Sequence, residues 1–263
     1  MHDEEGRHQD QESTQEVAWG RNSVLALIEE APKRIKKVLI ARDSHHQAIR
    51  KVEEYCRRDS IPFQKVERAS IERLCPGTSH QGVAALVSPV EMLDAATLGQ
   101  HLPPNPKPAM VLLLDHLQDP GNLGSIIRSA ESFGASAIVI PKRRAALPTG
   151  IVLKASAGAA ARLPIFTAPN LLFALDQLEP AGFWSVGLDH KAPETLDAKP
   201  LPVRLALIVG GEGQGISRPV EMRCDERRRI PMDGKSGSLN ASVATAIAMY
   251  EWKRTIDKAG SAP

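Results

Sequence analysis

Hydrophobic positions in the first third of the chain follow stretches of helical period that alternate with continuous apolar runs. Such alternation is typical of an α/β module, in which helices cover a buried sheet. We therefore predict a small α/β domain over residues 17–90. Its expected elements are a helix from Val24 to Ile28 capped by Ser23, a strand at 37–41, a helix at 48–57, and strands at 61–66 and 82–87.

A proline-dense stretch follows this module. Residues 102–108 read Leu-Pro-Pro-Asn-Pro-Lys-Pro. Proline lacks a backbone N–H and can continue neither a helix nor a central strand, so such a segment suits a semi-rigid spacer. We interpret residues 91–108 as a linker between two domains.

Beyond the linker, continuous apolar runs are separated by helical segments. This pattern is typical of a parallel sheet that is covered on both faces, whose ligands bind at the carboxyl ends of the strands. The second domain is predicted over residues 109–257. Its expected elements are strands at 109–114, 137–140, 183–187 and 205–209, and a long helix at 242–254.

The two ends of the chain carry few apolar side chains. Residues 1–16 are polar and rich in acidic groups, and we expect a disordered leader there, with a flexible tail at residues 258–263. The start has neither the basic nor the apolar stretch of a secretory signal. No apolar run approaches the roughly 20 residues that cross a bilayer. We therefore expect a cytoplasmic protein that does not bind membranes.

The distribution of charged residues along the chain says more about possible partners than the net charge does. A formal net charge of +2 does not by itself indicate a nucleic-acid binder. Basic side chains nevertheless crowd one short segment of the first domain, where they could contact RNA or form a solvated face. These residues are Lys33, Arg34, Lys36, Lys37 and Arg42.

The cysteines do not indicate a metal site. Cys56, Cys75 and Cys224 are widely spaced and form no pair or cluster with the spacing of zinc ligands. We interpret them as reduced thiols and expect no metal.

A first polar motif follows the strand at residues 109–114. Asp119-Pro-Gly turns the chain, Asn122 lies near the start of a helix, and Arg128 lies almost two helical turns further on. A helix cap at Asn122 and a surface ion pair at Arg128 would be the structural explanation.

A second motif is the glycine-rich loop at residues 207–216, which follows a strand and carries Glu212. Its glycines let the backbone approach a ligand closely, although a flexible turn would look the same. It is neither a dinucleotide fingerprint nor a P-loop. The GxGxxG spacing is missing, and Gly234-Lys-Ser has Arg229 where a P-loop needs glycine.

A third motif, Ile-Pro-Met-Asp-Gly-Lys-Ser-Gly-Ser-Leu-Asn at residues 230–240, precedes the last helix. Ser238 and Asn240 flank the start of that helix. There they could cap it, or they could meet a polar ligand together with the free backbone N–H groups.

Together and in this order, the three motifs resemble the SpoU/TrmH branch of the SPOUT RNA methyltransferases. The family pattern has N-x5-R after a first strand, a GxEGxG-like loop, and IPM-x-G…SLN before the last helix, and the resemblance covers residues 109 to about 255. The first domain resembles the L30e-like RNA-binding domain of the 23S rRNA guanosine 2′-O-methyltransferases in this family. Trp19-Gly-Arg-Asn-Ser-Val lies at its start and His80-Gln-Gly-Val at its end.

This resemblance implies a homodimer with a trefoil knot in the C-terminal part of the sheet. It also implies methyl transfer from S-adenosylmethionine to a ribose 2′-hydroxyl of RNA, with a guanosine of 23S rRNA as the preferred substrate. By matching motif positions, the cofactor contacts are Gly210, Ile230 and Leu239. The catalytic residues are Asn122, Arg128, Glu212, Ser238 and Asn240.

Arg128 is the residue of this pattern that would lie at the ribose hydroxyl. Arginine side chains stay charged near neutral pH because their ordinary pKa exceeds about 12, so a general-base role is chemically awkward. Our hypothesis is that Arg128 holds and polarises the hydroxyl. His80 and His116 are the other candidate bases, and we interpret both as structural or RNA-contacting.

Three alternatives remain open at this point. One is a tRNA ribose methyltransferase, because the catalytic motifs are shared across the family. Another is a non-catalytic RNA-binding protein that keeps the fold. A nicotinamide dehydrogenase is the third, and the missing dinucleotide fingerprint argues against it.

Overall fold

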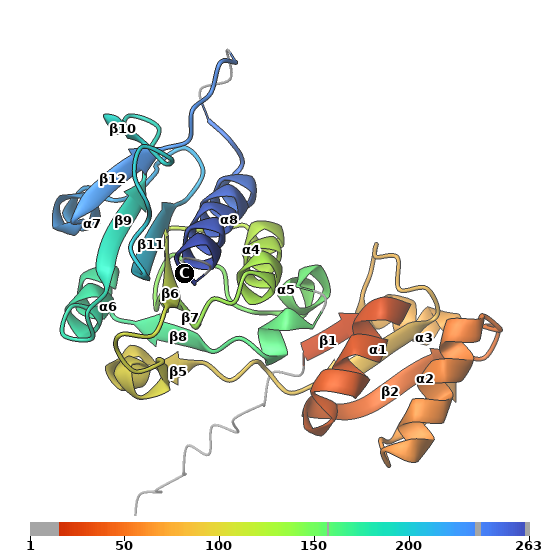
Figure 1. Ribbon diagram of the computed structural model, residues 1–263. Coiled ribbons are helices and arrows are strands. Elements are labelled where there is room, and N and C mark those ends of the chain that lie inside the picture. The colour runs from red at the N-terminus through yellow and green to blue at the C-terminus, as the bar shows by residue number, and fades with distance from the viewer. Residues whose placement is uncertain (1–15, 157, 235–237, 261–263) are drawn as a thin grey trace, which may run out of the picture.

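A computed structural model describes residues 16–156, 158–234 and 238–260 (Figure 1). Two separate sheets organise these residues, one of four strands and one of eight. The predicted leader lies outside the described residues except for Glu16, which is the first residue of a strand. No helix in the described ranges is long and apolar enough to span a membrane.

The first domain is built on a four-stranded sheet of order β1-β4-β2-β3, as Figure 1 shows in orange and red. Gly20, at a φ of 93°, precedes the first helix, so the expected cap at Ser23 was wrong and Ser23 is buried inside the helix. The elements are β1 (Glu16–Trp19), α1 (Arg21–Glu30), η1 (Pro32–Arg34), β2 (Ile35–Ala41), α2 (Gln47–Arg58), β3 (Phe63–Val66), α3 (Arg68–Leu74) and β4 (Val83–Val87).

The second domain holds an eight-stranded sheet in which every strand pair is parallel. Its order is β10-β12-β9-β11-β6-β7-β8-β5, which places β6 and β11 side by side at the centre. The elements are β5 (Leu93–Asp94), η2 (Ala95–His101), β6 (Ala109–Asp115), α4 (Pro120–Ser132), β7 (Ala137–Pro141), α5 (Gly150–Ala155), η3 (Ala159–Ala161), β8 (Ile165–Ala168), α6 (Leu171–Leu178), β9 (Trp184–Leu188), β10 (Glu194–Thr195), β11 (Arg204–Gly210), α7 (Arg218–Arg223), β12 (Glu226–Arg229) and α8 (Ala241–Gly260).

Alternating side chains of β6 show why this strand is apolar throughout. Met110, Leu112 and Leu114 join the cluster that includes residues of α4 and α8. Val111 and Leu113 join the cluster on the opposite face, with residues of α6 and η2. Because successive strand residues point to opposite faces, helices on both sides require a continuous apolar run.

The structure differs from the predicted linker and tail. Leu93 and Asp94 form an edge strand of the large sheet, and Leu98 of η2 is buried in its core. Only part of residues 91–108 therefore connects two separate units. The last helix extends to Gly260, beyond the start of the predicted tail.

The two domains meet through α1 and the segment around α5. Arg162 forms ion pairs with Glu30 of α1 and Glu131 of α4. Gly158, at a φ of 89°, lies against Ala26 and Glu30, where a Cβ atom would collide with the Glu30 carboxylate. The division into domains at residues 17–90 and 109–257 and the trefoil knot stay predictions.

Candidate functional site

The carboxyl ends of β6 and β11 meet at one edge of the large sheet. Asp115 ends β6 and is in register with Gly210, which ends β11. The Gly211 N–H donates to the backbone oxygen of Asp115 at 2.7 Å, and the Ser217 N–H donates to its carboxylate at 2.7 Å. Asp115 thus holds both ends of the loop at residues 211–217.

Gly210 lies where two backbone segments almost touch. A Cβ atom at this position would come within 2.0 Å of the Gly215 carbonyl carbon. A side chain at Gly211 would meet the His116 oxygen at 2.3 Å. The glycine-rich motif therefore forms a tight cradle, where the sequence also allowed a flexible turn.

Three predicted catalytic residues form a closed hydrogen-bonded triangle. The Asn122 amide donates to Glu212 Oε1 at 2.7 Å. The Asn240 amide donates to Glu212 Oε1 and to Asn122 Oδ1, both at 3.0 Å. The structure therefore brings together one residue from each sequence motif, although the first and last are 118 positions apart.

Helix caps set the positions of two triangle members. Asp119, and not Asn122, caps α4, because its carboxylate accepts from the Asn122 N–H at 2.6 Å. Asn122 is buried, and its side chain is left to meet Glu212. Asn240 Oδ1 accepts from the Ser242 N–H and hydroxyl, so Asn240 both caps α8 and joins the triangle.

Arg128 stands apart from the triangle. It is exposed on α4, roughly 9 Å of helical rise beyond Asn122. Within the described ranges, its guanidinium makes no hydrogen bond or ion pair. This removes the alternative of a surface ion pair and leaves the side chain available for a ligand.

A cavity of about 550 Å³ opens beside the triangle, and we call it the inner cavity. Its wall includes all three predicted cofactor contacts, Gly210, Ile230 and Leu239, and also Glu212 and Ser238. Many of its lining residues lie at or just beyond the carboxyl ends of β9, β11 and β12.

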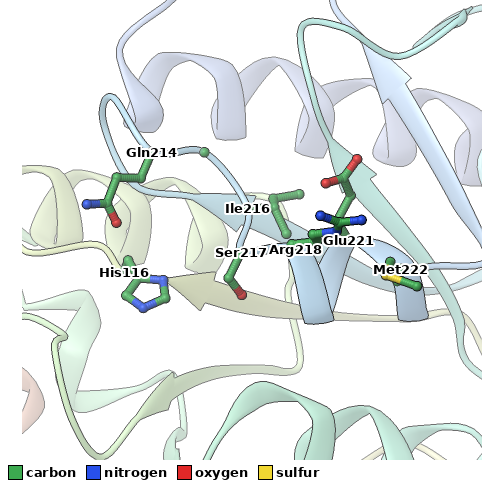
Figure 2. A pocket seen from close by; sticks show the side chains of 8 residues that line it. His116, Gln214, Ile216, Ser217, Arg218, Glu221 and Met222 are labelled. Atoms are coloured by element: carbon green, nitrogen blue, oxygen red, sulfur yellow. The ribbon is translucent and has the colours of Figure 1, made fainter.

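A second cavity of about 600 Å³ lies against the same glycine-rich loop (Figure 2). This outer cavity is lined by His116, Gln214–Ser217, Arg218, Glu221 and Met222. The His116 Nδ1 lies 2.8 Å from the Asp115 carboxylate that holds the loop. His80 has a structural role in the first domain, where it is buried and accepts a hydrogen bond from the Gly82 N–H.

Two kinds of site residue were not found from the sequence. Asp189, His190 and Lys191 line the inner cavity directly after β9. That strand was predicted, so its carboxyl end was a signal that could have located them. Asp115 directly follows the predicted strand at 109–114 and had the same signal, but its contacts with Gly211 and Ser217 come about 100 residues later and could not be inferred from the sequence.

Comparison with known proteins places this geometry in a family. Residues 109–250 match the SpoU rRNA Methylase family. The chain belongs to the SpoU rRNA methylase family. Residues 17–93 also match the family described as RNA 2′-O ribose methyltransferase substrate binding. The predicted family is thus confirmed, and this methyltransferase is an S-adenosylmethionine-dependent RNA 2′-O-methyltransferase.

Individual relatives extend over nearly the whole methyltransferase. It is 36% identical to a Bacillus subtilis protein named as a TrmH family tRNA/rRNA methyltransferase, over 92% of this chain and 96% of the relative. It is 35% identical to the 23S rRNA (guanosine-2′-O-)-methyltransferase RlmB of Xylella fastidiosa, over 88% and 93%. The SpoU methyltransferase AviRb of Streptomyces viridochromogenes, solved with AdoMet, has a similar fold, with a TM-score of 0.77, 23% identity and coverage of 95% and 92%.

The inner cavity fits the family's cofactor. Its volume lies within the usual range of small-molecule sites, roughly 300–1,000 Å³. The absence of side chains at Gly210 and Gly211 lets two backbone segments pack tightly against each other, and both glycines lie in the cavity wall. Backbone groups there, with Ile230 and Leu239 as apolar walls, would hold S-adenosylmethionine, which supplies an electrophilic methyl group when bound.

Proposed function

We propose that the methyltransferase modifies the ribose 2′-hydroxyl of a guanosine in 23S rRNA. The observation that carries this proposal is the similarity to the Xylella fastidiosa enzyme, which extends over both domains of the chain. A match to a substrate-binding family over residues 17–93 supports an RNA-binding role for the first domain. The Bacillus subtilis relative, whose name covers both tRNA and rRNA, makes a tRNA ribose the second candidate.

The triangle suggests how the chain prepares the reaction. Glu212 Oε1 accepts both amide hydrogen bonds, from Asn122 and Asn240, which fixes the orientation of the carboxylate. Its second oxygen can then accept from the ribose or from a guanidinium. Positioned polar groups of this kind stabilise charge that develops during the reaction.

Arg128 and Ser238 would complete the site when RNA binds. Both side chains are exposed, and Ser238 lies in the wall of the inner cavity. In this mechanism Arg128 donates to the 2′-hydroxyl oxygen and an adjacent phosphate, and Ser238 positions the nucleotide. The guanidinium thereby stabilises negative charge on the 2′-oxygen as the hydroxyl proton passes to water.

The five residues of the proposed RNA-binding segment differ in exposure and in partners. Arg34 donates to the Ser88 backbone oxygen at 2.7 Å, and burial lowers the pKa of its guanidinium, so it has a structural role. Lys33 and Lys36 are exposed. Lys37 donates to Gln64 at 2.6 Å, and Arg42 lies 3.8 Å from a carboxylate of Glu67, so both have competing partners.

Charge reversal at Lys33 and Lys36 is expected to weaken RNA binding and to flatten its dependence on salt. Each lost phosphate contact should reduce the slope of log affinity against log salt by about 0.7–0.9. Filter binding at several salt concentrations measures this slope. Lys258→Glu, near the far end of α8, is the control for general charge effects, and an unchanged slope in Lys33→Glu/Lys36→Glu would remove this segment from the interface.

We also propose that the methyltransferase is a homodimer, as its family resemblance implies. One face of α8 exposes Val243, Ile247 and Tyr250, at spacings of four and three residues. Such an apolar stripe on a helix is typical of a surface that packs against a partner. The stripe starts three residues after Asn240, so a second subunit on this face would lie close to the triangle.

Ile247→Asp is expected to convert the dimer into monomers, because one buried aspartate per subunit in an apolar contact is costly. Light scattering after size exclusion measures the mass. Val203→Asp is the matched control, since Val203 is 43% exposed on the loop before β11. A dimer that survives Ile247→Asp would place the subunit contact elsewhere.

Mapping of 2′-O-methyl groups in total RNA tests the proposed substrate. A deletion strain should lose one mark in 23S rRNA, and the wild-type gene, but not the gene for Arg128→Ala, should restore it. Loss of a tRNA mark instead would overturn the rRNA proposal in favour of the second candidate.

A further inference from the structure

Arg218 directly follows the loop at residues 211–217, and it differs from the other arginines near this loop in having no protein partner among the described residues. Three arginines that line the inner cavity are committed to protein partners. Arg227 pairs with Asp189 and Glu221, Arg228 with Glu226, and Arg229 donates to the backbone oxygen of Ala192. Arg218, in the outer cavity, is exposed and makes no hydrogen bond or ion pair within the ranges that the structure describes.

The other polar groups of the outer cavity are compatible with an anion. Figure 2 shows the Gln214 amide and the His116 ring on one side of this cavity and Arg218 on the other, beside Glu221. The Asp115 carboxylate orients the His116 ring through its Nδ1, so a neutral ring turns an accepting nitrogen, not a donor, to the cavity. The anion's donors must therefore come from Arg218 and Gln214. Glu221 is the carboxylate in the wall, and its charge is compensated by the ion pair with Arg227.

The position of this cavity links it to the reaction site. Gln214, Gly215, Ile216 and Glu221 line both cavities, so one loop separates the two. The same loop carries Glu212 of the triangle. An anion in the outer cavity would therefore lie next to a nucleotide whose ribose reaches Glu212.

We propose that the outer cavity binds a backbone phosphate of the substrate RNA adjacent to the methylated nucleotide. Arg218 supplies the charge and a planar pair of donors, and the Gln214 amide adds a neutral donor. This inference rests on the proposed RNA methyltransferase function and deepens it. Because phosphate contacts carry no sequence information, the cavity sets affinity and register, not the choice of base.

Arg218→Ala tests this site. The KM for RNA should rise about tenfold, and the slope of log RNA affinity against log salt should fall by about 1. The affinity for S-adenosylmethionine, measured by calorimetry, should stay within twofold of wild type. Arg218→Lys should keep most of the salt slope, since the charge remains, but show an intermediate KM because a lysine cannot bind a phosphate bidentately.

Lys258→Ala is the matched control, since it removes one exposed positive charge roughly 26 Å along α8 from the helix start. Wild-type KM and salt slope in Arg218→Ala would overturn the proposal. A parallel loss of S-adenosylmethionine affinity would also overturn it, because Arg218 would then support the loop. The filter assay measures RNA binding without methylation. If the proposed function fails, the wild-type protein does not methylate RNA, and this result is distinguishable from the failure of the phosphate site.

Discussion

Replacing Arg128 by alanine is expected to lower kcat by about 100- to 1,000-fold, the usual effect of removing one donor that stabilises charge in the reaction. The fold should be unaffected, because Arg128 is exposed and, among the described residues, has no side-chain partner to lose. Single-turnover methylation with saturating RNA and S-adenosylmethionine measures the chemical step. The affinity for S-adenosylmethionine should stay within about twofold.

Arg128→Lys separates charge from geometry. Lysine keeps the positive charge but not the planar set of donors, so we expect a loss of at least about tenfold from one missing charged hydrogen bond. Ser125→Ala, at an exposed position one turn earlier on α4, controls for changes to the helix surface. Near-full turnover in the lysine variant would show that a guanidinium is not required.

Gly210→Ala is expected to abolish tight S-adenosylmethionine binding. A Cβ atom would come within 2.0 Å of the Gly215 carbonyl carbon, and this neighbour is backbone held by the Gly211–Gly215 contact. The loop must therefore move, at a cost of about 1–3 kcal/mol typical of overpacking. We expect at least a tenfold weaker affinity by calorimetry, since tenfold corresponds to about 1.4 kcal/mol.

Two other glycines make this experiment specific. Gly99→Ala has open space and should behave as wild type. Gly213→Ala also has open space, but its φ of 83° disfavours any side chain, so it reports backbone strain alone. If Gly210→Ala bound S-adenosylmethionine as tightly as Gly99→Ala, the cradle would not be part of the cofactor site.

The second domain shows which elements a sequence pattern can predict. The strands β6 and β11 were predicted because both faces are buried and every position is apolar. β12 was not, since it reads Glu-Arg-Arg-Arg. Arg228 is 1% exposed there, and its guanidinium is satisfied by Glu226 and by the backbone oxygen of Lys199. Those partners are brought close only by the fold, so local periodicity could not reveal the strand.

The same distinction applies to the site. Residue types and their order identified Asn122, Glu212 and Asn240, but their mutual hydrogen bonds depend on the pairing of distant strands. The helix cap that would have explained Asn122 structurally is Asp119 instead, because both residue types are good caps and only the turn geometry decides between them. The partial burial of Arg34 against Ser88 was likewise not predictable, since it follows from tertiary packing, and RNA contact at this residue stays a prediction.

The triangle also constrains when the protein becomes active during its synthesis. Asn240 lies 118 residues after Asn122, so translation at about 5–20 residues per second separates their appearance by roughly 6–24 s. Glu212 follows Asn122 by 90 residues, so for most of that interval Asn122 has neither of its partners, although α4 and Arg128 are made early in it. Newly made protein therefore acquires the complete triangle only as the last helix is translated. A truncated messenger RNA that ends before codon 240 yields a protein without it.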